Sequence, residues 1–293
     1  MTSAKTLKFA LLASMISFSP AAVAQSGAFA VFSETSEQSG SAVDYAPYQE
    51  LFNVLAIRDD ERTLVAYEAI RESAAGFLTS YTRYLASVDV TSLSRDDQLA
   101  YWLNTRNFLV VKALSEERSL RNFDDKRGTP SAPGSLWSAK RISVNGVMLS
   151  IDDIERQILL GGWDNPYIIY GLYQGLEGGP ALPSTPFNGQ TVDAELSRIA
   201  AEFTKDRDIF RARRGSVRLG EFYEWYAPSV FDGDSAALLR HIREASRTGE
   251  VFQDTAEISY RNMSSTVERF RPRQSSASSG FGSSGGGSFG RGS

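Results

Sequence analysis

The sequence contains no cysteine and only one histidine, His241, among its 293 residues. The absence of cysteine excludes disulfide bonds, thiolate nucleophiles and cysteine-ligated metal sites. One histidine is too few for most zinc sites, which leaves only oxygen ligands of the kind that calcium uses. Asp232 and Asp234 lack further acids at alternating spacing, so we expect them to serve a turn and a helix cap. The composition therefore predicts no metal site and no cofactor.

The chain also lacks an excess of basic residues, since 31 lysines and arginines stand against 35 aspartates and glutamates. Binding of nucleic acid through a basic surface is therefore not expected. Near the start, Lys5 and Lys8 precede an apolar run, residues 9–18, that is too short to span a bilayer. Ala22 and Ala24 follow at the spacing of a cleavage site. This pattern predicts a signal peptide, residues 1–24, and an exported protein, periplasmic or secreted, with no membrane span after cleavage.

Two segments of the chain are rich in small polar residues and contain few large apolar ones. From Arg271 onward 15 of the 23 residues are Gly or Ser, and residues 25–44 are also rich in Ser. Such segments bury too little apolar area to offset the entropy cost of ordering. We therefore predict a flexible linker at 25–44 and a disordered tail at 270–293, in which Phe281 and Phe289 are the only candidate contact residues. The remaining residues, 45–269, are enough for one domain.

Apolar residues at helical spacing dominate this domain. We expect helices over residues 47–56, 63–88, 95–114, 193–204, 220–226 and 235–245. Ser94 is a plausible N-cap of the third of these helices, because acids follow it in the first turn. Asn145 and Gly146 lie between two β-prone runs in residues 140–150 and predict a β-hairpin. Short strands are expected at residues 216–219 and 256–261. The fold class is α+β, a mainly helical single domain with a short β-hairpin and a few short strands.

The hairpin leads directly into a predicted helix that begins at a capping box formed by Ser150 and Asp153. Apolar residues at 151, 154, 158 and 159 make one face of this helix. Glu155 lies past the cap, so its side chain either reaches inward as a general acid or base or pairs with Arg156 or another surface cation. Together with Glu177, it is a conceivable pair of carboxylates for glycan hydrolysis, because burial can separate the pKa values of two acids.

Residues 165–183 combine aromatics, four glycines and two further prolines after the Pro at 166. Asn165 and Pro166 predict a helix start, and Gly175 predicts its end. Gly178, Gly179 and a proline then permit a tight chain path. Four aromatic residues in and before this segment are candidates for a wall that stacks against sugars or peptides: Trp163, Tyr167, Tyr170 and Tyr173.

Asn104 and Asn107 lie three residues apart on an otherwise apolar helix. A buried amide must find hydrogen-bond partners for its donors and its acceptor. One interpretation is that both residues bind loop backbone. The loop around Gly178, Gly179 and Pro180, here called the Gly-Pro loop, is a candidate. The other interpretation is that both bind a substrate. We favour the first.

Several spaced blocks resemble the signature of the domain of unknown function 547 family. They are YWLNTRN at 101–107, LSIDDIERQIL at 149–159, NPYIIYGLYQGLEGGPALP at 165–183 and EFYEWYAPSVF at 221–231. Trp102, Asn104 and Asn107 fit the family pattern, and the similarity spans residues 99–263. The resemblance implies an α+β domain, often exported in bacteria, without an established reaction.

The chain departs from that family at several positions. Arg106 stands where an aromatic is usual, and Arg156 stands where the family often has histidine. The places of an arginine, a histidine and two cysteines are taken by Tyr167, Ile169, Gln174 and Gly179. A thiol-based reaction therefore cannot be carried over to this chain.

These patterns leave three functional hypotheses. The first is a non-catalytic exported domain that binds an envelope-associated small molecule, glycan or protein through Trp102, Asn104, Asn107, Tyr167, Tyr170 and Gln174. The second is a hydrolase that uses Glu155, Glu177 or Ser184 in place of the family's cysteine and histidine positions. The third is a scaffold whose tail makes the contacts. His241 is expected to be an exposed residue of a charged helix rather than a catalytic base.

Overall fold

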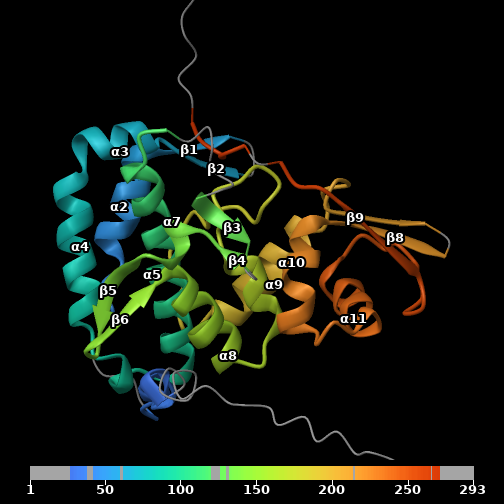
Figure 1. Ribbon diagram of the computed structural model, residues 1–293, viewed down its shortest axis with the longest axis horizontal. Coiled ribbons are helices and arrows are strands. Elements are labelled where there is room, and N and C mark those ends of the chain that lie inside the picture. The colour runs from blue at the N-terminus through green and yellow to red at the C-terminus, as the bar shows by residue number, and fades with distance from the viewer. Residues whose placement is uncertain are drawn as a thin grey trace, which may run out of the picture.

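A computed structural model describes residues 27–37, 42–59, 62–119, 126–129, 132–213, 215–264 and 266–270. These residues form a mainly helical α+β domain with four small sheets among the described strands (Figure 1). The fold class expected from the sequence is therefore confirmed. The predicted signal peptide and the predicted tail beyond residue 270 lie outside the described residues.

The centre of the domain is helix α5, Arg95–Glu116, which is buried on nearly all sides. It contacts the helices α3 (Tyr67–Ser73), α4 (Ala75–Ser87) and α9 (Val192–Phe203) and the helical segment η3 (Asp153–Leu159) (Figure 1). A helix surrounded by others needs no polar face, which explains why its residues do not follow an amphipathic pattern. Its start is as predicted, because the Ser94 side chain accepts a hydrogen bond from the backbone N–H of Asp97.

Short helices surround α5, and several match the expected ranges closely. Their bounds are η1 Ala30–Ser33, α2 Ala46–Leu55, α3 Tyr67–Ser73, α4 Ala75–Ser87, η2 Val90–Ser92, α7 Ser135–Ser138, α8 Leu160–Gly162, α9 Val192–Phe203, α10 Glu221–Val230 and α11 Ser235–Ala245. Within the predicted linker 25–44, η1 packs its Phe32 ring edge-on against Trp102 at 4.9 Å between ring centroids. The packed core therefore begins before the predicted boundary at residue 45.

The hairpin is confirmed as strands β5, Lys140–Val144, and β6, Val147–Ser150. Asn145 and Gly146 both have positive φ, as a two-residue turn between right-twisted strands requires. The capping box that follows is also present, because the backbone N–H groups of Ser150 and Asp153 each bond the other residue's side chain, at 2.7 and 3.0 Å.

Two predicted helices differ from the expectation. Residues 63–65 belong to strand β2, Arg62–Val65, which pairs with β1, Ala56–Asp59, and a break at Ala74 then separates α3 from α4. The first residues of the predicted helix alternate between half-buried and buried, so they follow the period of a strand rather than that of a helix. Residues Asp153–Leu159 form η3, a π-helix, and not the expected α-helix.

A second group of strands lies at the far side of the domain from α4 (Figure 1). Strand β8, Ser216–Gly220, pairs antiparallel with β7, Phe210–Arg213, and parallel with β9, Glu257–Arg261. A short pair, β3 Gly128–Thr129 and β4 Ala132–Pro133, completes the described strands. The predicted strands at 216–219 and 256–261 are thus confirmed to within a residue.

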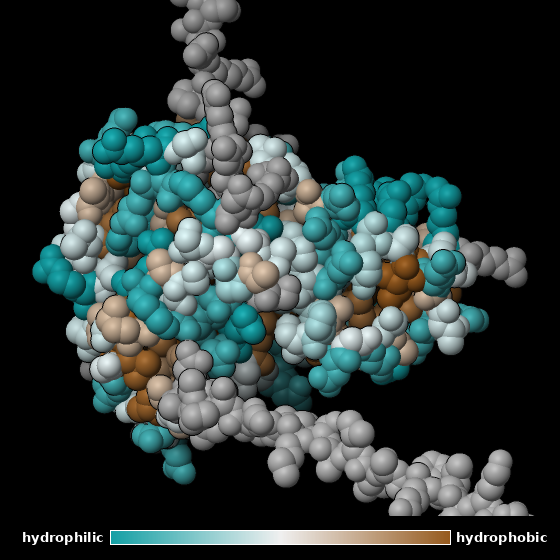
Figure 2. Space-filling view, viewed as in Figure 1, coloured by the Kyte–Doolittle hydropathy of each residue, from teal (hydrophilic) through white to brown (hydrophobic). Residues whose placement is uncertain are grey.

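The surface seen in Figure 2 is mostly hydrophilic, with small apolar areas over the β5–β6 hairpin and beside α11. Met148 is an exposed apolar residue of β6. Scattered apolar areas of this kind are normal for a folded domain. Within the described part of the chain, none of the helices has the length and apolar character needed to cross a membrane.

Candidate functional site

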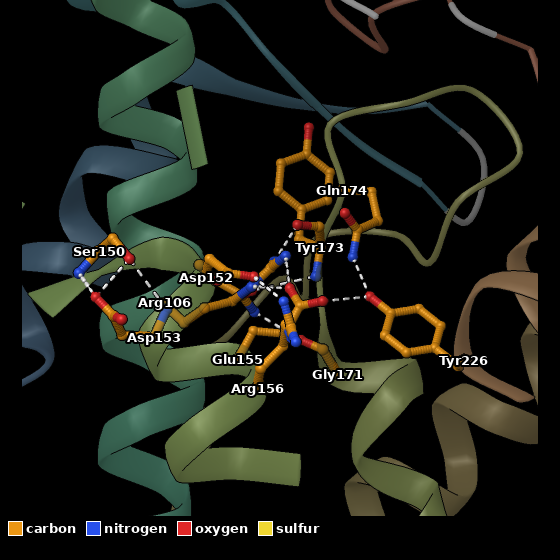
Figure 3. A network of polar contacts seen from close by, with 11 residues as sticks. Arg106, Ser150, Asp152, Asp153, Glu155, Arg156, Gly171, Tyr173, Gln174 and Tyr226 are labelled. Atoms are coloured by element: carbon orange, nitrogen blue, oxygen red, sulfur yellow. Dashed lines mark hydrogen bonds and ion pairs between the residues drawn. The ribbon is translucent and has the colours of Figure 1, made fainter. Parts of the chain in front are cut away.

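A buried ion pair between Arg106 and Glu155 joins the central helix to η3 (Figure 3). Both residues are nearly inaccessible, with 0% and 2% of their surface exposed. Glu155 Oε2 accepts from Arg106 Nη2 at 2.6 Å and from Nε at 3.2 Å. Two charges in a dry interior are tolerated only when they pair and their remaining polar atoms find partners. The partner of Glu155 is therefore a buried arginine and not the neighbouring Arg156, which pairs with Asp152.

The second carboxylate oxygen of Glu155 continues the network towards α10. Tyr226 donates its hydroxyl to Glu155 Oε1 at 2.8 Å and accepts from Gln174 Nε2 at 2.7 Å. Burial, together with the negative charge of Glu155, raises the pKa of Tyr226 well above its usual range. Tyr226 therefore stays protonated and serves as a permanent donor to the carboxylate.

The opposite end of the guanidinium binds the backbone of the Gly-rich segment. Arg106 Nη1 donates to the Tyr173 carbonyl and to Asn107 Oδ1. Asn107 in turn bonds the Gly171 carbonyl at 2.8 Å and the Tyr173 N–H at 3.1 Å. The adjacent amide, Asn104, holds both the N–H and the carbonyl of Phe187, at 2.8 and 2.9 Å.

These bonds agree with the interpretation that Asn104 and Asn107 tie α5 to loop backbone. The loops are those around Gly171 and Phe187, which flank the Gly-Pro loop. Close packing at Gly171 has the same effect, because a Cβ there would lie 2.7 Å from Leu196 Cδ2. The central helix therefore fixes the path of the chain on both sides of residues 174–184.

The predicted aromatic wall is not assembled on the surface. Tyr170 and Tyr173 are fully buried, and the Tyr173 hydroxyl lies 2.5 Å from that of Tyr67. Asn165 caps the segment as predicted, but the turn Pro166–Gly171 is a 3-10 helix, η4, with its apolar side chains in the core. Trp102, another binding candidate, is also fully buried. Tyr170 and Tyr173, which were predicted to stack against a ligand, thus pack in the core instead.

The expectation that His241 is exposed is wrong. Its ring is 5% exposed and packs against Tyr167, with 4.8 Å between ring centroids, while Nε2 lies 3.0 Å from the Tyr170 hydroxyl. Burial lowers the pKa of His241 to about 4. The imidazole is therefore neutral near pH 7. It lies on the buried face of α11, whereas the neighbouring arginines in the sequence had suggested the exposed, charged face.

Asp152 lies at the start of the same π-helical segment as Glu155 (Figure 3). Burial raises the pKa of Asp152 to about 6, and the nearby Arg156 guanidinium opposes that rise from 3.7 Å. Asp153 behaves differently, because its hydrogen bonds to Lys140 and Ser150 outweigh its burial and lower its pKa. Two adjacent aspartates thus have opposite pKa shifts.

A cleft of about 450 Å³ lies between the Gly-Pro loop and the end of α9. Its apolar part contains Leu182, Ile199, Phe203 and Ile209, and Ser184 lies on the loop side. The charged residues of its lining are Arg62, Arg198, Glu202, Lys205 and Asp206. Clefts of this size that combine apolar walls with a few polar groups are typical small-molecule sites.

A smaller hollow of about 240 Å³ adjoins the cleft and shares Asp206 and Ile209 with it. Glu177 and Gly178 line it from the loop side, and residues 261–264, at and just after the end of β9, line it from the other. The Glu177 carboxylate is exposed and lies 3.4 Å from Ser264 Oγ. Within the described residues no group of three or more acids and histidines is placed to hold a metal ion.

The sequence profile of the family described as "Protein of unknown function, DUF547" matches residues 90–204. This part of the chain belongs to the DUF547 family. The resemblance read from the sequence is confirmed there, whereas its last block, residues 221–231, lies outside the matched range. No curated protein and no solved structure matches the chain.

The DUF547 segment contains α5, the hairpin, η3, η4 and α9, so it holds both members of the Arg106–Glu155 pair. The tyrosine that completes the network, Tyr226, comes from α10 beyond the matched residues. Arg62 in the cleft also lies outside them. Elements around the DUF547 segment therefore complete both the buried network and the open cleft.

The sequence candidates fall into two groups, one in the buried network and one at the open spaces. Glu155 and Gln174 meet at the Tyr226 hydroxyl, but Asn104 is directed to Phe187 and Glu177 lies at the surface, so the four do not converge on one pocket. Of the candidate reactive residues, Ser184 lines the cleft and Glu177 lines the adjoining hollow. Glu155 and Glu177 do not form a pair across one open site.

Ser184 is the one cleft residue among the sequence candidates, and those that they missed include Arg62, Arg198, Ile199 and Lys205. In the sequence each is one of many charged or apolar residues on an amphipathic pattern, with no motif to set it apart. The sequence feature that indicated this cleft was the position of Ser184 just after the Gly-Pro loop, because Ser184 lies on the loop side of the cleft.

Proposed function

We propose that this DUF547 protein is a non-catalytic binding domain and that its ligand site is the cleft between the Gly-Pro loop and α9. The observation that carries the proposal is the composition of the cleft wall, in which apolar side chains are combined with both cations and acids. Such a lining fits an organic ligand that has an apolar part and polar ends.

The alternative reading, a hydrolase, has less support from the same geometry. Ser184 is half-buried in the cleft, but the described lining residues around it include no histidine, and the only histidine packs under Tyr167. A serine nucleophile needs an adjacent base. Glu155, the other candidate, is occupied by Arg106 and Tyr226 inside the core.

We also propose that the protein is exported through the signal peptide at residues 1–24 and that the ligand is a small molecule, glycan or peptide of the cell envelope. The support is the charge and apolar pattern of those residues. Fractionation of cells that express the full chain, with N-terminal sequencing of the mature product, tests export. A protein that keeps residues 1–24 and stays in the cytoplasm would contradict it.

Ligand binding is tested by a thermal-shift and NMR screen of the full mature chain against glycans, peptides and cell-wall fragments. Ala181→Trp fills the cleft, because residue 181 lines it, and Thr79→Trp places the same side chain on the exposed side of α4 as a control. We expect a binder whose signal disappears in Ala181→Trp and persists in Thr79→Trp. Binders that are insensitive to Ala181→Trp would overturn the location of the site. Ser184→Ala should leave binding intact. If a bound compound is hydrolysed by the parent chain and not by Ser184→Ala, the hydrolase is favoured instead.

A further inference from the structure

The cleft and the hollow beside it share part of their lining and are together called the groove. The chain segment 177–184 lines both of them, with Glu177 and Gly178 in the hollow and residues 181–184 in the cleft. The opposite wall is also shared, because Asp206 and Ile209 line both spaces. A ligand longer than the cleft therefore has a path along the Gly-Pro loop from one space into the other.

The two ends of this groove carry opposite excess charge. The cleft has three cationic side chains and two acids, Glu202 and Asp206, in its lining. The hollow has three acids, Glu177, Asp206 and Asp208, and one cation, Arg261. Counted over the lining residues alone, the cleft has one excess cation and the hollow two excess acids, while Glu268 and Glu195, which pair with Arg62 and Arg198, lie outside the lining. A separation of charge along the groove favours a ligand whose own charges are separated in the same way.

Two of the charges at the ends, those of Arg198 and Glu177, are exposed, whereas Arg62 is held by the buried Glu268 and by the Gly179 carbonyl. Arg198 is 61% exposed and pairs with Glu195 one helical turn away on α9, through hydrogen bonds of 2.9 and 2.6 Å. Glu177 has a long contact to a serine hydroxyl. Exposed ion pairs contribute only about 0–1 kcal/mol, so a ligand group can replace such a partner at little cost.

The middle of the groove is apolar. Ile209, which is buried and shared by both spaces, lies beside Leu182, Ile199 and Phe203. An aliphatic side chain placed there would remove apolar surface from water. A neutral glycan would use neither the charge separation nor this apolar floor.

We infer that the groove binds a short peptide with free ends, and this inference rests on the proposed function of the cleft. The terminal carboxylate lies toward Arg198 in the cleft, the terminal ammonium toward Glu177 in the hollow, and an aliphatic side chain between them over Ile209. Each end makes a charge-assisted hydrogen bond, which is stronger than a neutral one.

Isothermal titration calorimetry, which measures the affinity of the mature chain for the tripeptide Ala-Leu-Ala, tests this assignment. The same tripeptide is also used with an acetylated amino terminus and with an amidated carboxyl terminus. We expect each blocking group to weaken binding about tenfold, because each removes one charged hydrogen bond. Equal affinities for the three peptides would overturn the inference.

Two substitutions assign each peptide end to its side chain. Glu177→Gln should abolish the preference for a free amino terminus and keep the preference for a free carboxylate, and Arg198→Gln should do the reverse. Glu72→Gln and Arg83→Gln, which make the same changes on exposed positions of α3 and α4, should change neither preference. A Glu177→Gln variant that weakens all three peptides equally would contradict the assignment.

The outcomes also separate this inference from the proposed function. If a neutral chito-oligosaccharide binds and Ala181→Trp abolishes its binding while Ala-Leu-Ala does not bind, the peptide assignment fails and the cleft remains the ligand site. If no ligand in the screen is sensitive to Ala181→Trp, both proposals fail.

Discussion

The buried network and the open groove use the same residue types under opposite conditions. Arg106 and Glu155 are withdrawn from water and have protein partners on both sides of the pair. Arg198 and Glu177 face solvent and have weak or local partners. A buried charge is costly unless it is fully paired, whereas an exposed charge is hydrated whether it is paired or not. The first pair is therefore bound to the fold, and the second pair is free to meet a ligand.

The network also explains how the groove keeps its shape. Arg106 and Asn107 hold the backbone just before residue 174, and Asn104 holds it after residue 184. The loop between these points supplies one whole wall of the groove. Polar residues in the core thus position a surface that they do not touch.

Glu155→Gln should have the largest effect, because it leaves the Arg106 charge in the core without its counter-charge. We expect unfolding free energy to fall by about 3–5 kcal/mol, measured by urea denaturation of the mature chain. The double variant Arg106→Met and Glu155→Leu removes both charges and should recover much of that loss. A single variant as stable as the parent would show that the ion pair does not hold the core together.

His241 should make stability fall as pH falls. Its pKa in the fold is about 4, below the ordinary 6.5 of an unfolded histidine, so protonation favours unfolding. The stability is fully present above pH 6.5 and is lost progressively towards pH 4, by about 3 kcal/mol. His241→Phe should lose this part of the pH dependence, although it also removes the bond to Tyr170. An unchanged slope between pH 6.5 and 4 would contradict the buried, neutral imidazole.

Asp152 should act in the opposite direction, with a smaller effect. Its pKa in the fold is about 6 and exceeds the ordinary 3.8, so the fold favours the protonated acid and loses stability as pH rises from about 4 to 6. Its side chain is 19% exposed, which tempers the effect. Asp152→Asn should stabilise the protein by about 1–2 kcal/mol at pH 7 and not at pH 4. Thermal unfolding at the two pH values measures this difference, and a gain at pH 4 as large as at pH 7 would argue against it.

Local patterns predicted the parts of this site that depend on neighbours in sequence. The turn at Asn145 and Gly146 and the cap at Ser150 need only adjacent residues, and both are present as expected. The hydrogen bonds of Asn104 and Asn107 to loop backbone could also be predicted, because a buried amide on an apolar helix must find hydrogen-bond partners.

The remaining features depend on contacts between distant segments. The partner of Glu155 is 49 residues away on α5, so the sequence offered the adjacent Arg156 instead. A π-helix changes which residues share a face, and an α-helical template does not anticipate that change. Buried and exposed tyrosines also look alike in a sequence. The groove could not be predicted, because its walls come from residues 62–63, 177–184, 198–209, 220 and 261–264, which are far apart in the sequence.

Glu177→Gln makes the same chemical change as Glu155→Gln but at the surface, and it should have the smallest effect on stability. We expect the unfolding free energy to change by no more than about 0.5 kcal/mol, since an exposed carboxylate with one long contact contributes little. Urea denaturation of the two variants side by side measures the contrast. Comparable losses in both would mean that the Glu177 carboxylate is needed to hold the Gly-Pro loop, and a loss of peptide binding in Glu177→Gln would then report on loop structure rather than on recognition of an ammonium group. A stable variant that has lost only its preference for a free amino terminus assigns that carboxylate to ligand recognition.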